Sequence, residues 1–168
     1  VIEMGMNRPG EIGYLTQLAR PTVALVTNAQ RAHLQGMGSV NEVAREKGAI
    51  YDGLAADGGA VINADDAFAS YWKAINAGRR TLTFGLSAGA DVTAQCTING
   101  FGSDVALTSP QGDTNFRLQV PGQHNVRNAL AAAAACLAAG ISLAAVAEGL
   151  GGYTGTAGRL HLRKGAGD

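Results

Sequence analysis

The sequence is poor in several features that would point to particular classes of protein. It has only two cysteines, Cys96 and Cys136, in 168 residues. They lie far apart, and their separation fits no metal-binding or redox spacing and no disulfide framework. We therefore expect both to be reduced side chains that contribute to packing.

The chain also lacks an excess of charge and a long apolar run. Thirteen basic residues balance thirteen acidic ones, so no positive field attracts phosphate backbones or anionic membranes. The longest apolar stretch, residues 129–139, is mostly alanine and too short to cross a bilayer, and no cationic leader precedes an apolar run. We expect a soluble, cytoplasmic monomer with no nucleic acid or membrane partner.

Apolar residues make up 46% of the chain, which is enough for one substantial core in a single domain spanning residues 1–168. The sequence opens on the strand-like VIEMGM without an initiator methionine, and it ends in RLHLRKGAGD, where a strand-like run has just begun. We expect the chain to lie inside a larger protein.

Short apolar runs alternate with helical patterns in the first part of the chain, which is typical of βαβ units and a parallel sheet. Strands are expected over residues 1–6, 22–28 and 59–63, and helices over residues 11–19, 39–54 and 65–75.

From residue 80 to residue 120 the pattern changes to strands, TLTFGL, DVTAQCTI, DVALTS and NFRLQV, separated by turn residues. This favours antiparallel pairing in a smaller β-layer. An alanine-rich helix over 124–139, ended by Gly140, and a shorter helix over 142–150 follow. The expected fold is α/β, a mostly parallel sheet flanked by helices with a smaller antiparallel β-layer.

Ligands in open α/β sheets bind outside the carboxyl ends of the parallel strands, which selects the EMGMNRPGEI turn and the TNAQRAHLQG loop. Glu3 lies among apolar residues, where an ionised carboxylate is costly without compensation. A metal ion would compensate it, and so would an arginine or a role as a helix cap. His33 could bind a divalent ion or orient a phosphate, or it is a surface residue or turn partner.

Lys47 is the most informative residue. It falls within the apolar face of its helix, so its ammonium is partly desolvated and its pKa is lowered. A neutral amine reacts with carbon dioxide to give a carbamate, which is a metal-binding carboxylate. The alternative is a lysine whose stem packs while its head reaches water. The apolar face is formed by Val40, Val43, Ala44, Ile50, Tyr51 and Leu54.

Two later segments carry polar side chains at positions that suit a ligand. Asn125 and Asn128 lie one helical turn apart at the start of a helix and could read an adenine edge, although Asn125 is also a suitable N-cap. Arg159, after a glycine-rich approach, suits a phosphate or carboxylate, and a surface arginine is an equal alternative. The NRPGEI segment opens a helix where N–H groups could meet an anion, and plain helix initiation explains it as well.

Together these residues resemble the Mur ligases. The EMGMNRPGEI segment favours the members that add D-alanyl-D-alanine, because sister ligases carry different residues after the glutamate. The resemblance runs through the whole chain, in the order VIEMGMNRPGEI, VTNAQRAHLQGMGS, EVAREKGAIYDGL, NADD, VPGQHNVRNALAAAA and GRL.

The resemblance implies the P-loop-type central domain of an ATP-dependent amide ligase that joins D-alanyl-D-alanine to UDP-N-acetylmuramoyl-tripeptide through an acyl phosphate. This reaction serves peptidoglycan synthesis, cell shape and cell division. The resemblance to the Mur ligases also implies roles for individual residues. Glu3, His33 and carbamylated Lys47 would hold Mg²⁺, Asn125 and Asn128 would contact adenine, and Arg159 would contact the γ-phosphate. Asn28 would either lie on the phosphate side or support a residue that contacts the ligand.

One motif of the family is missing, since GxxGK[ST], the phosphate loop, occurs nowhere in the sequence. The resemblance also implies a UDP-sugar domain and a carboxy-terminal domain on either side, which we expect to lie outside this sequence. We therefore expect no ligation and weak or undetectable nucleotide binding by this chain alone. The alternatives are a related ligase of the folylpolyglutamate or cyanophycin synthetase type, or a non-catalytic isolated domain.

Overall fold

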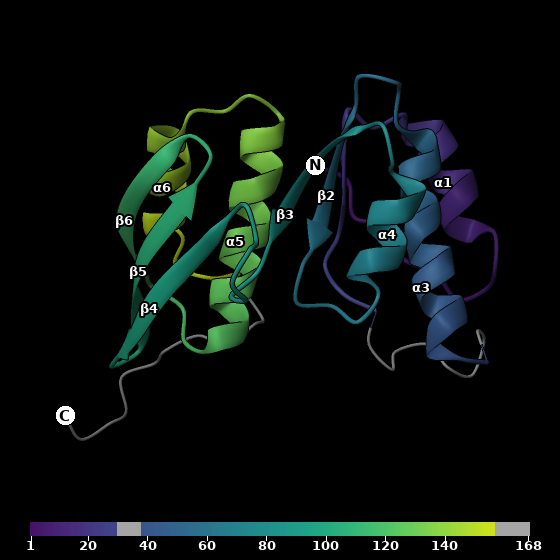
Figure 1. Cartoon of the computed structure of the whole chain (residues 1–168). Helices are drawn as coiled ribbons and strands as arrows, with labels where there is room; N and C mark the ends of the chain where they lie inside the picture. Colours follow the sequence, from purple (N-terminus) through teal and green to yellow (C-terminus); the bar gives the residue numbers. More distant parts are fainter. Residues whose placement is uncertain (30–37, 157–168) are drawn as a thin grey trace.

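Two sheets and the helices around them make up the part of the chain that the structure, a computed structural model, describes, residues 1–29 and 38–156 (Figure 1). One sheet is parallel, in the strand order β1-β2-β3, and the other is antiparallel, in the order β4-β5-β6. The expected α/β fold, a parallel sheet flanked by helices with an antiparallel β-layer, is confirmed, although each sheet has three strands, so the antiparallel layer has as many strands as the parallel sheet.

The parallel sheet consists of β1 (Val23–Val26), β2 (Gly59–Asn63) and β3 (Arg80–Phe84). All five residues of the central strand β2 are buried, as expected for a parallel strand covered on both faces. The chain returns between these strands through α3 (Val40–Gly48) and the 3-10 helix Ala49–Gly53, and then through α4 (Ala69–Ile75).

Helices α1 (Glu11–Ala19), α3 and α4 cover one face of the parallel sheet (Figure 1). Their core contains Trp72, whose indole Nε1 donates a hydrogen bond to the Ala44 carbonyl at 3.0 Å. Buried Glu46 of α3 accepts hydrogen bonds from the N–H groups of Gly10 and Ile12, at 2.8 and 2.9 Å. These bonds satisfy N–H groups at the start of α1 that have no partner within the helix.

Helix α5 (Gln123–Ala138) covers the other face and lies between the two sheets, while α6 (Leu143–Gly151) packs on β6. Gly140 has a φ of 83° and ends α5, with its N–H bonded to the Leu137 carbonyl and the Ile141 N–H bonded to the Cys136 carbonyl. This is a Schellman C-cap. Among the helices of the described ranges, none is sufficiently long and apolar for a membrane span.

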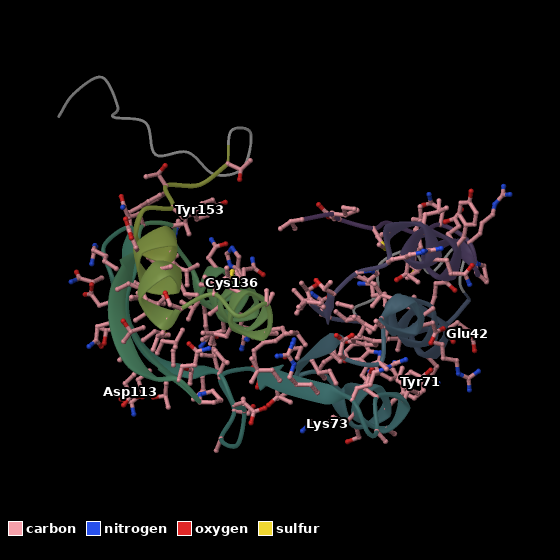
Figure 2. The ribbon with its side chains drawn as sticks, turned by 90° about the horizontal axis from the view of Figure 1, so that it is seen from above. Glu42, Tyr71, Lys73, Asp113, Cys136 and Tyr153 are labelled. Carbon is pink, nitrogen blue, oxygen red and sulfur yellow. The ribbon has the colours of Figure 1, made fainter. Side chains whose placement is uncertain are left out.

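The antiparallel sheet consists of β4 (Thr93–Asn99), β5 (Gly102–Ser109) and β6 (Gly112–Leu118). Buried and exposed residues alternate along β5, so one face packs on α5 and the other faces outward. Figure 2 shows Asp113 of this sheet at the opposite end of the molecule from Glu42 and Tyr71 of the helical layer. Cys96 and Cys136 are unpaired and half-buried against this core, as expected.

Two strand expectations are wrong. Residues 1–6 form no strand, because no strand of the described chain pairs with them, and Val1 and Ile2 are exposed. TLTFGL does not join the antiparallel layer, because α4 brings the chain back in the same direction and β3 pairs with β2 in parallel.

Two helices are shorter than expected. The helix expected over 39–54 is an α-helix only to Gly48 and continues as the 3-10 helix. The helix expected over 65–75 begins at Ala69, because Asn63 and Asp66 accept hydrogen bonds from the N–H groups of Asp65 and Phe68. Such side-chain bonds favour a turn over a helix.

Candidate functional site

Lys47 lies in the last turn of α3, where it is half-buried at the carboxyl edge of the parallel sheet. Its Nζ donates a hydrogen bond to the Asn28 carbonyl oxygen at 2.7 Å, so the head of the side chain meets protein instead of reaching only water. Burial lowers the pKa of Lys47, and the Asp66 carboxylate partly offsets this effect. The amine is therefore more readily available in its neutral, nucleophilic form than that of an exposed lysine.

Asn63 and Asp66, at the end of β2, hold the segment that follows β1. The Asn63 amide donates to the Thr27 carbonyl at 2.7 Å, and Asp66 Oδ2 accepts from the Ala29 N–H at 2.8 Å. The second oxygen of Asp66 accepts from the Phe68 N–H at 2.9 Å. These bonds fix the backbone that presents the Asn28 carbonyl to Lys47.

Asp65 holds the loop that follows β3. Its two oxygens accept from the N–H groups of Leu86 and Ser87 at 2.8 and 2.9 Å, and Arg127 Nε of α5 lies 3.7 Å from Oδ2. Burial raises the pKa of Asp65, but the hydrogen bonds from Ser87 and Leu86 and the charge of Arg127 outweigh it, so the pKa is lowered overall. The carboxylate is therefore stabilised in its charged form.

These contacts form one continuous set, which we call the carboxyl-edge network. It runs from α3 across the ends of all three parallel strands to the start of α5, and it comprises Lys47, Asn63, Asp65, Asp66 and Arg127. The sequence identified Lys47 but assigned no role to the other four, although NADD was noted as a motif. Two adjacent carboxylates directly after a buried strand were the available signal.

Asn125 and Asn128 lie on the first turns of α5, and the Asn128 amide is 3.5 Å from Asn125 Oδ1. The N-cap of α5 is Gly122, so the alternative role of Asn125 as N-cap is wrong. Its amide donates instead to the Pro121 carbonyl at 2.7 Å, which ties the helix to the turn before it. Asn128 is exposed, so its polar edge is accessible to a ligand.

Of the remaining expected site residues, only Glu3 lies within the described ranges, and it takes no part in the carboxyl-edge network. Glu3 is exposed and makes no ion pair with another described residue, so the expectation that apolar surroundings make its charge costly is wrong. Its surroundings differ from the expectation because no strand forms around it. His33 and Arg159 lie outside the described residues.

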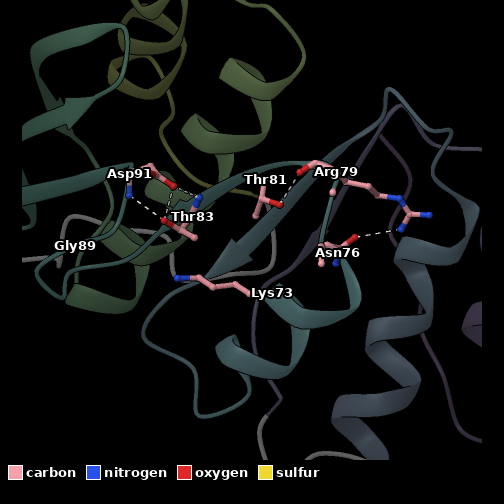
Figure 3. Close-up of a pocket in the computed structure, with 9 residues that line it drawn as sticks. Lys73, Asn76, Arg79, Thr81, Thr83, Gly89 and Asp91 are labelled. Atoms are coloured by element: carbon pink, nitrogen blue, oxygen red, sulfur yellow. Dashed lines mark hydrogen bonds between the residues drawn. The ribbon is translucent and has the colours of Figure 1, made fainter.

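A pocket of about 350 Å³ opens elsewhere, beside β3 and the end of α4 (Figure 3). Lys73, Arg79 and Thr81 line it, and Asp91 borders it while accepting a hydrogen bond from the Thr83 N–H at 2.8 Å. None of its lining residues belongs to the carboxyl-edge network or to the expected site. The pocket is therefore a separate feature.

Metal-binding side chains are not grouped within residues 1–29 and 38–156, where no three of His, Cys, Asp and Glu lie close enough to hold an ion. All four carboxylate oxygens of Asp65 and Asp66 already accept backbone N–H groups. A metal ion at these two residues would compete with those bonds.

The parallel sheet, with polar side chains gathered at its carboxyl edge, places the chain among the open α/β proteins, a class whose ligand sites lie at that edge. The family model for the Mur ligase middle domain matches residues 1–136. The chain belongs to the Mur ligase family.

Individual relatives agree with this assignment. UDP-N-acetylmuramoyl-tripeptide–D-alanyl-D-alanine ligase of Escherichia coli is 40% identical over 162 residues, which cover 95% of this chain and 36% of the relative. A crystal structure of MurF from Acinetobacter baumannii matches with a TM-score of 0.94 and 34% identity, covering 99% of this chain and 37% of that one. The expected likeness to the D-alanyl-D-alanine-adding members is confirmed, and the chain spans about a third of their length.

More distant structures share the fold alone. MurF of Thermotoga maritima, solved in complex with ADP, matches with a TM-score of 0.78 at 21% identity, covering 96% of this chain and 37% of that one. An FPGS of L. casei matches with a TM-score of 0.70 at 19% identity, covering 90% of this chain and 38% of that one.

Proposed function

We propose that this chain is the middle portion of a longer, cytoplasmic, monomeric ligase that adds D-alanyl-D-alanine to UDP-N-acetylmuramoyl-tripeptide in peptidoglycan synthesis. The observation that carries the proposal is the half-buried Lys47 at the carboxyl edge, with its Nζ on the Asn28 carbonyl. Family membership and the names of the E. coli and A. baumannii relatives support it.

In the proposed reaction, a carboxylate oxygen of the tripeptide attacks the γ-phosphorus of ATP and ADP leaves. The amine of D-alanyl-D-alanine then attacks the acyl carbon and displaces phosphate, which forms the amide. Asn125 and Asn128 would bind the adenine edge, Asn28 would lie on the phosphate side, and Arg159 would contact the γ-phosphate. Membership of the Mur ligase family supports the use of a nucleotide.

We further propose that Lys47, as its carbamate, holds Mg²⁺ together with Glu3 and His33. The lowered pKa of Lys47 supports this, because the neutral amine adds to carbon dioxide and releases a proton. The carbamate nitrogen keeps one N–H, which allows the bond to the Asn28 carbonyl to persist. Magnesium would neutralise charge on the phosphate oxygens.

The chain by itself would not carry out ligation, because its 168 residues contain no GxxGK[ST] phosphate loop. The same absence leads us to expect weak or undetectable nucleotide binding by the isolated chain. The proposal therefore concerns the longer protein, with this chain supplying the adenine side and the lysine.

The test is phosphate release by the full-length protein with ATP, UDP-N-acetylmuramoyl-tripeptide and D-alanyl-D-alanine. We expect release that depends on both substrates and that is lost in Lys47→Ala. Added formate or acetate should restore part of the Lys47→Ala activity by replacing the carbamate, whereas Lys73→Ala, a lysine outside the carboxyl-edge network, should behave as the parent.

Each part of the proposal has its own contrary result. Phosphate release with a single amino acid, such as glutamate, but not with D-alanyl-D-alanine would favour one of the related ligases. No release with any of them would favour a non-catalytic domain. Full activity of Lys47→Ala would rule out the carbamate.

A further inference from the structure

We propose that Asp65 is a positioning residue, which sets the start of α5 relative to the carboxyl edge of the parallel sheet. The inference rests on the proposed function, because the nucleotide is the ligand that would contact both the start of α5 and the carboxyl edge of the parallel sheet. Two contacts of one carboxylate carry it: one to the loop after β3 and one to α5.

The first contact is a pair of hydrogen bonds to the loop after β3. Asp65 accepts hydrogen bonds from two consecutive N–H groups, those of Leu86 and Ser87, at 2.8 and 2.9 Å. Hydrogen bonds to an ionised acceptor are stronger than those between neutral groups. Gly85 permits this approach, since a Cβ there would lie 2.7 Å from Asp65 Oδ1.

The second contact reaches helix α5. Arg127 Nε lies 3.7 Å from Asp65 Oδ2, the same oxygen that accepts from the Leu86 N–H. Arg127 stands between Asn125 and Asn128 in the sequence of α5, within one helical turn of both. The carboxylate therefore connects the loop after β3 with the stretch of helix that carries the two asparagines.

Apolar packing alone does not define this placement. Val126, Ala129 and Leu130 of α5 are buried against the core, but hydrophobic contact is non-directional. A charged contact to one atom selects among the shifts and rotations that such packing tolerates. Since Asp65 also adjoins Asp66 in the carboxyl-edge network, it relates the asparagines to the strand ends near Lys47.

The first experiment needs no ligand. In ¹H–¹⁵N spectra of the chain, Arg127→Gln and Asp65→Asn should both shift the side-chain amide signals of Asn125 and Asn128. Arg117→Gln is the matched control, because it removes a shorter ion pair, 2.8 Å from Asp104, on the antiparallel sheet. Unmoved asparagine signals in both variants would overturn the inference.

The second experiment measures nucleotide use by the full-length protein. Arg127 is half-exposed, so Arg127→Gln should keep its melting temperature while its KM for ATP rises about threefold, in keeping with the modest strength of exposed ion pairs. Asp65→Asn should raise that KM about tenfold, because it weakens charged hydrogen bonds as well. Turnover at saturating ATP should change less than KM in both, and Arg127→Lys should recover part of the effect.

The results separate this inference from the proposed function. If the parent protein binds and uses ATP but both variants have the parent KM, Asp65 does not position the helix for the nucleotide and the inference is wrong. If the parent does not use ATP although the asparagine signals shift, the positioning stands and the proposed function fails.

Discussion

Asp65 and Asp66 are adjacent in the chain, yet their carboxylates hold different parts of the molecule. Asp66 binds the backbone after β1, 37 residues away, and Asp65 binds the loop after β3, 21 and 22 residues away. These carboxylates are partly buried and accept N–H groups, so removing one of them leaves those N–H groups without a partner. Substitution of Asp66 should therefore loosen the segment after β1, whereas substitution of Asp65 should loosen the loop after β3.

The pKa of Asp65 leads to a pH-dependent prediction. Because its pKa is lowered in the folded state, its contribution to stability is present above the unfolded value of about 3.9 and is lost as the pH falls through the folded value. Asp65→Asn should cost about 1 kcal/mol of unfolding free energy near pH 7. Urea denaturation between pH 7 and pH 3 should show this difference shrinking below about pH 4, and a constant difference would contradict the prediction.

Two serines of β5 should respond in opposite ways to the same substitution. Ser103 is fully buried, and its hydroxyl has no hydrogen-bond partner within the described part of the chain. Ser103→Ala should therefore raise the unfolding free energy by about 1 kcal/mol. Ser109 donates to the Gly112 carbonyl and accepts from the Gln111 N–H, so Ser109→Ala should lower it by a similar amount in chemical denaturation. Equal changes in unfolding free energy for the two variants would contradict the different hydrogen bonding of the two serines.

At the scale of elements, β3 shows how a connection decides the direction of a strand. Its alternating sequence suits either kind of sheet, and α4 delivers it parallel to β2. Asp65, just after β2, then holds the loop that follows β3 close to the end of β2 through a hydrogen bond. Close contact between these segments requires a glycine at position 85.

Two glycines in different elements test this contact. Gly85→Ala should displace the Asp65 carboxylate and lower the unfolding free energy by about 2 kcal/mol through the lost hydrogen bonds. Gly149 lies within α6, where a Cβ would meet nothing within 4 Å, so Gly149→Ala should raise it by about 0.5–1 kcal/mol. Thermal or urea unfolding of the pair provides the measurement. If Gly85→Ala stabilised the protein, the close contact between Asp65 and the loop after β3 would be ruled out.

At the scale of the whole molecule, the parallel sheet joins two cores. Val61 of β2 belongs to the core shared with α5 and the antiparallel layer, while its neighbours Ala60 and Ile62 belong to the core under α1, α3 and α4. Successive side chains of a strand point to opposite faces. The same strand therefore stabilises both layers.

We expect the two cores to unfold together. Trp72, the single tryptophan of the chain, is buried in the core beneath α4 and reports on that side alone. Its fluorescence and far-ultraviolet circular dichroism, which reports on all helices and strands, should follow one urea transition with the same midpoint. Separated midpoints would indicate two independently folding parts and contradict the expectation of a single domain.

Local sequence determined much of this protein. The bounds of α1, the burial alternation of β5, the end of α5 at Gly140 and the desolvated Lys47 follow from periodicity and capping within a few residues. The order of motifs also led to the Mur ligases, which the comparisons confirm. The metal and phosphate roles of His33 and Arg159 stay predictions.

Only the tertiary structure decided how distant segments meet at the carboxyl edge. The parallel direction of β3 and the carboxyl-edge network depend on contacts between residues about 20–40 positions apart. Periodicity reports which face of an element is apolar, but it carries no information about the neighbour that the element meets. A carboxylate after a buried strand reads the same in sequence whether it holds a loop or a ligand, and only the folded backbone supplies its partner.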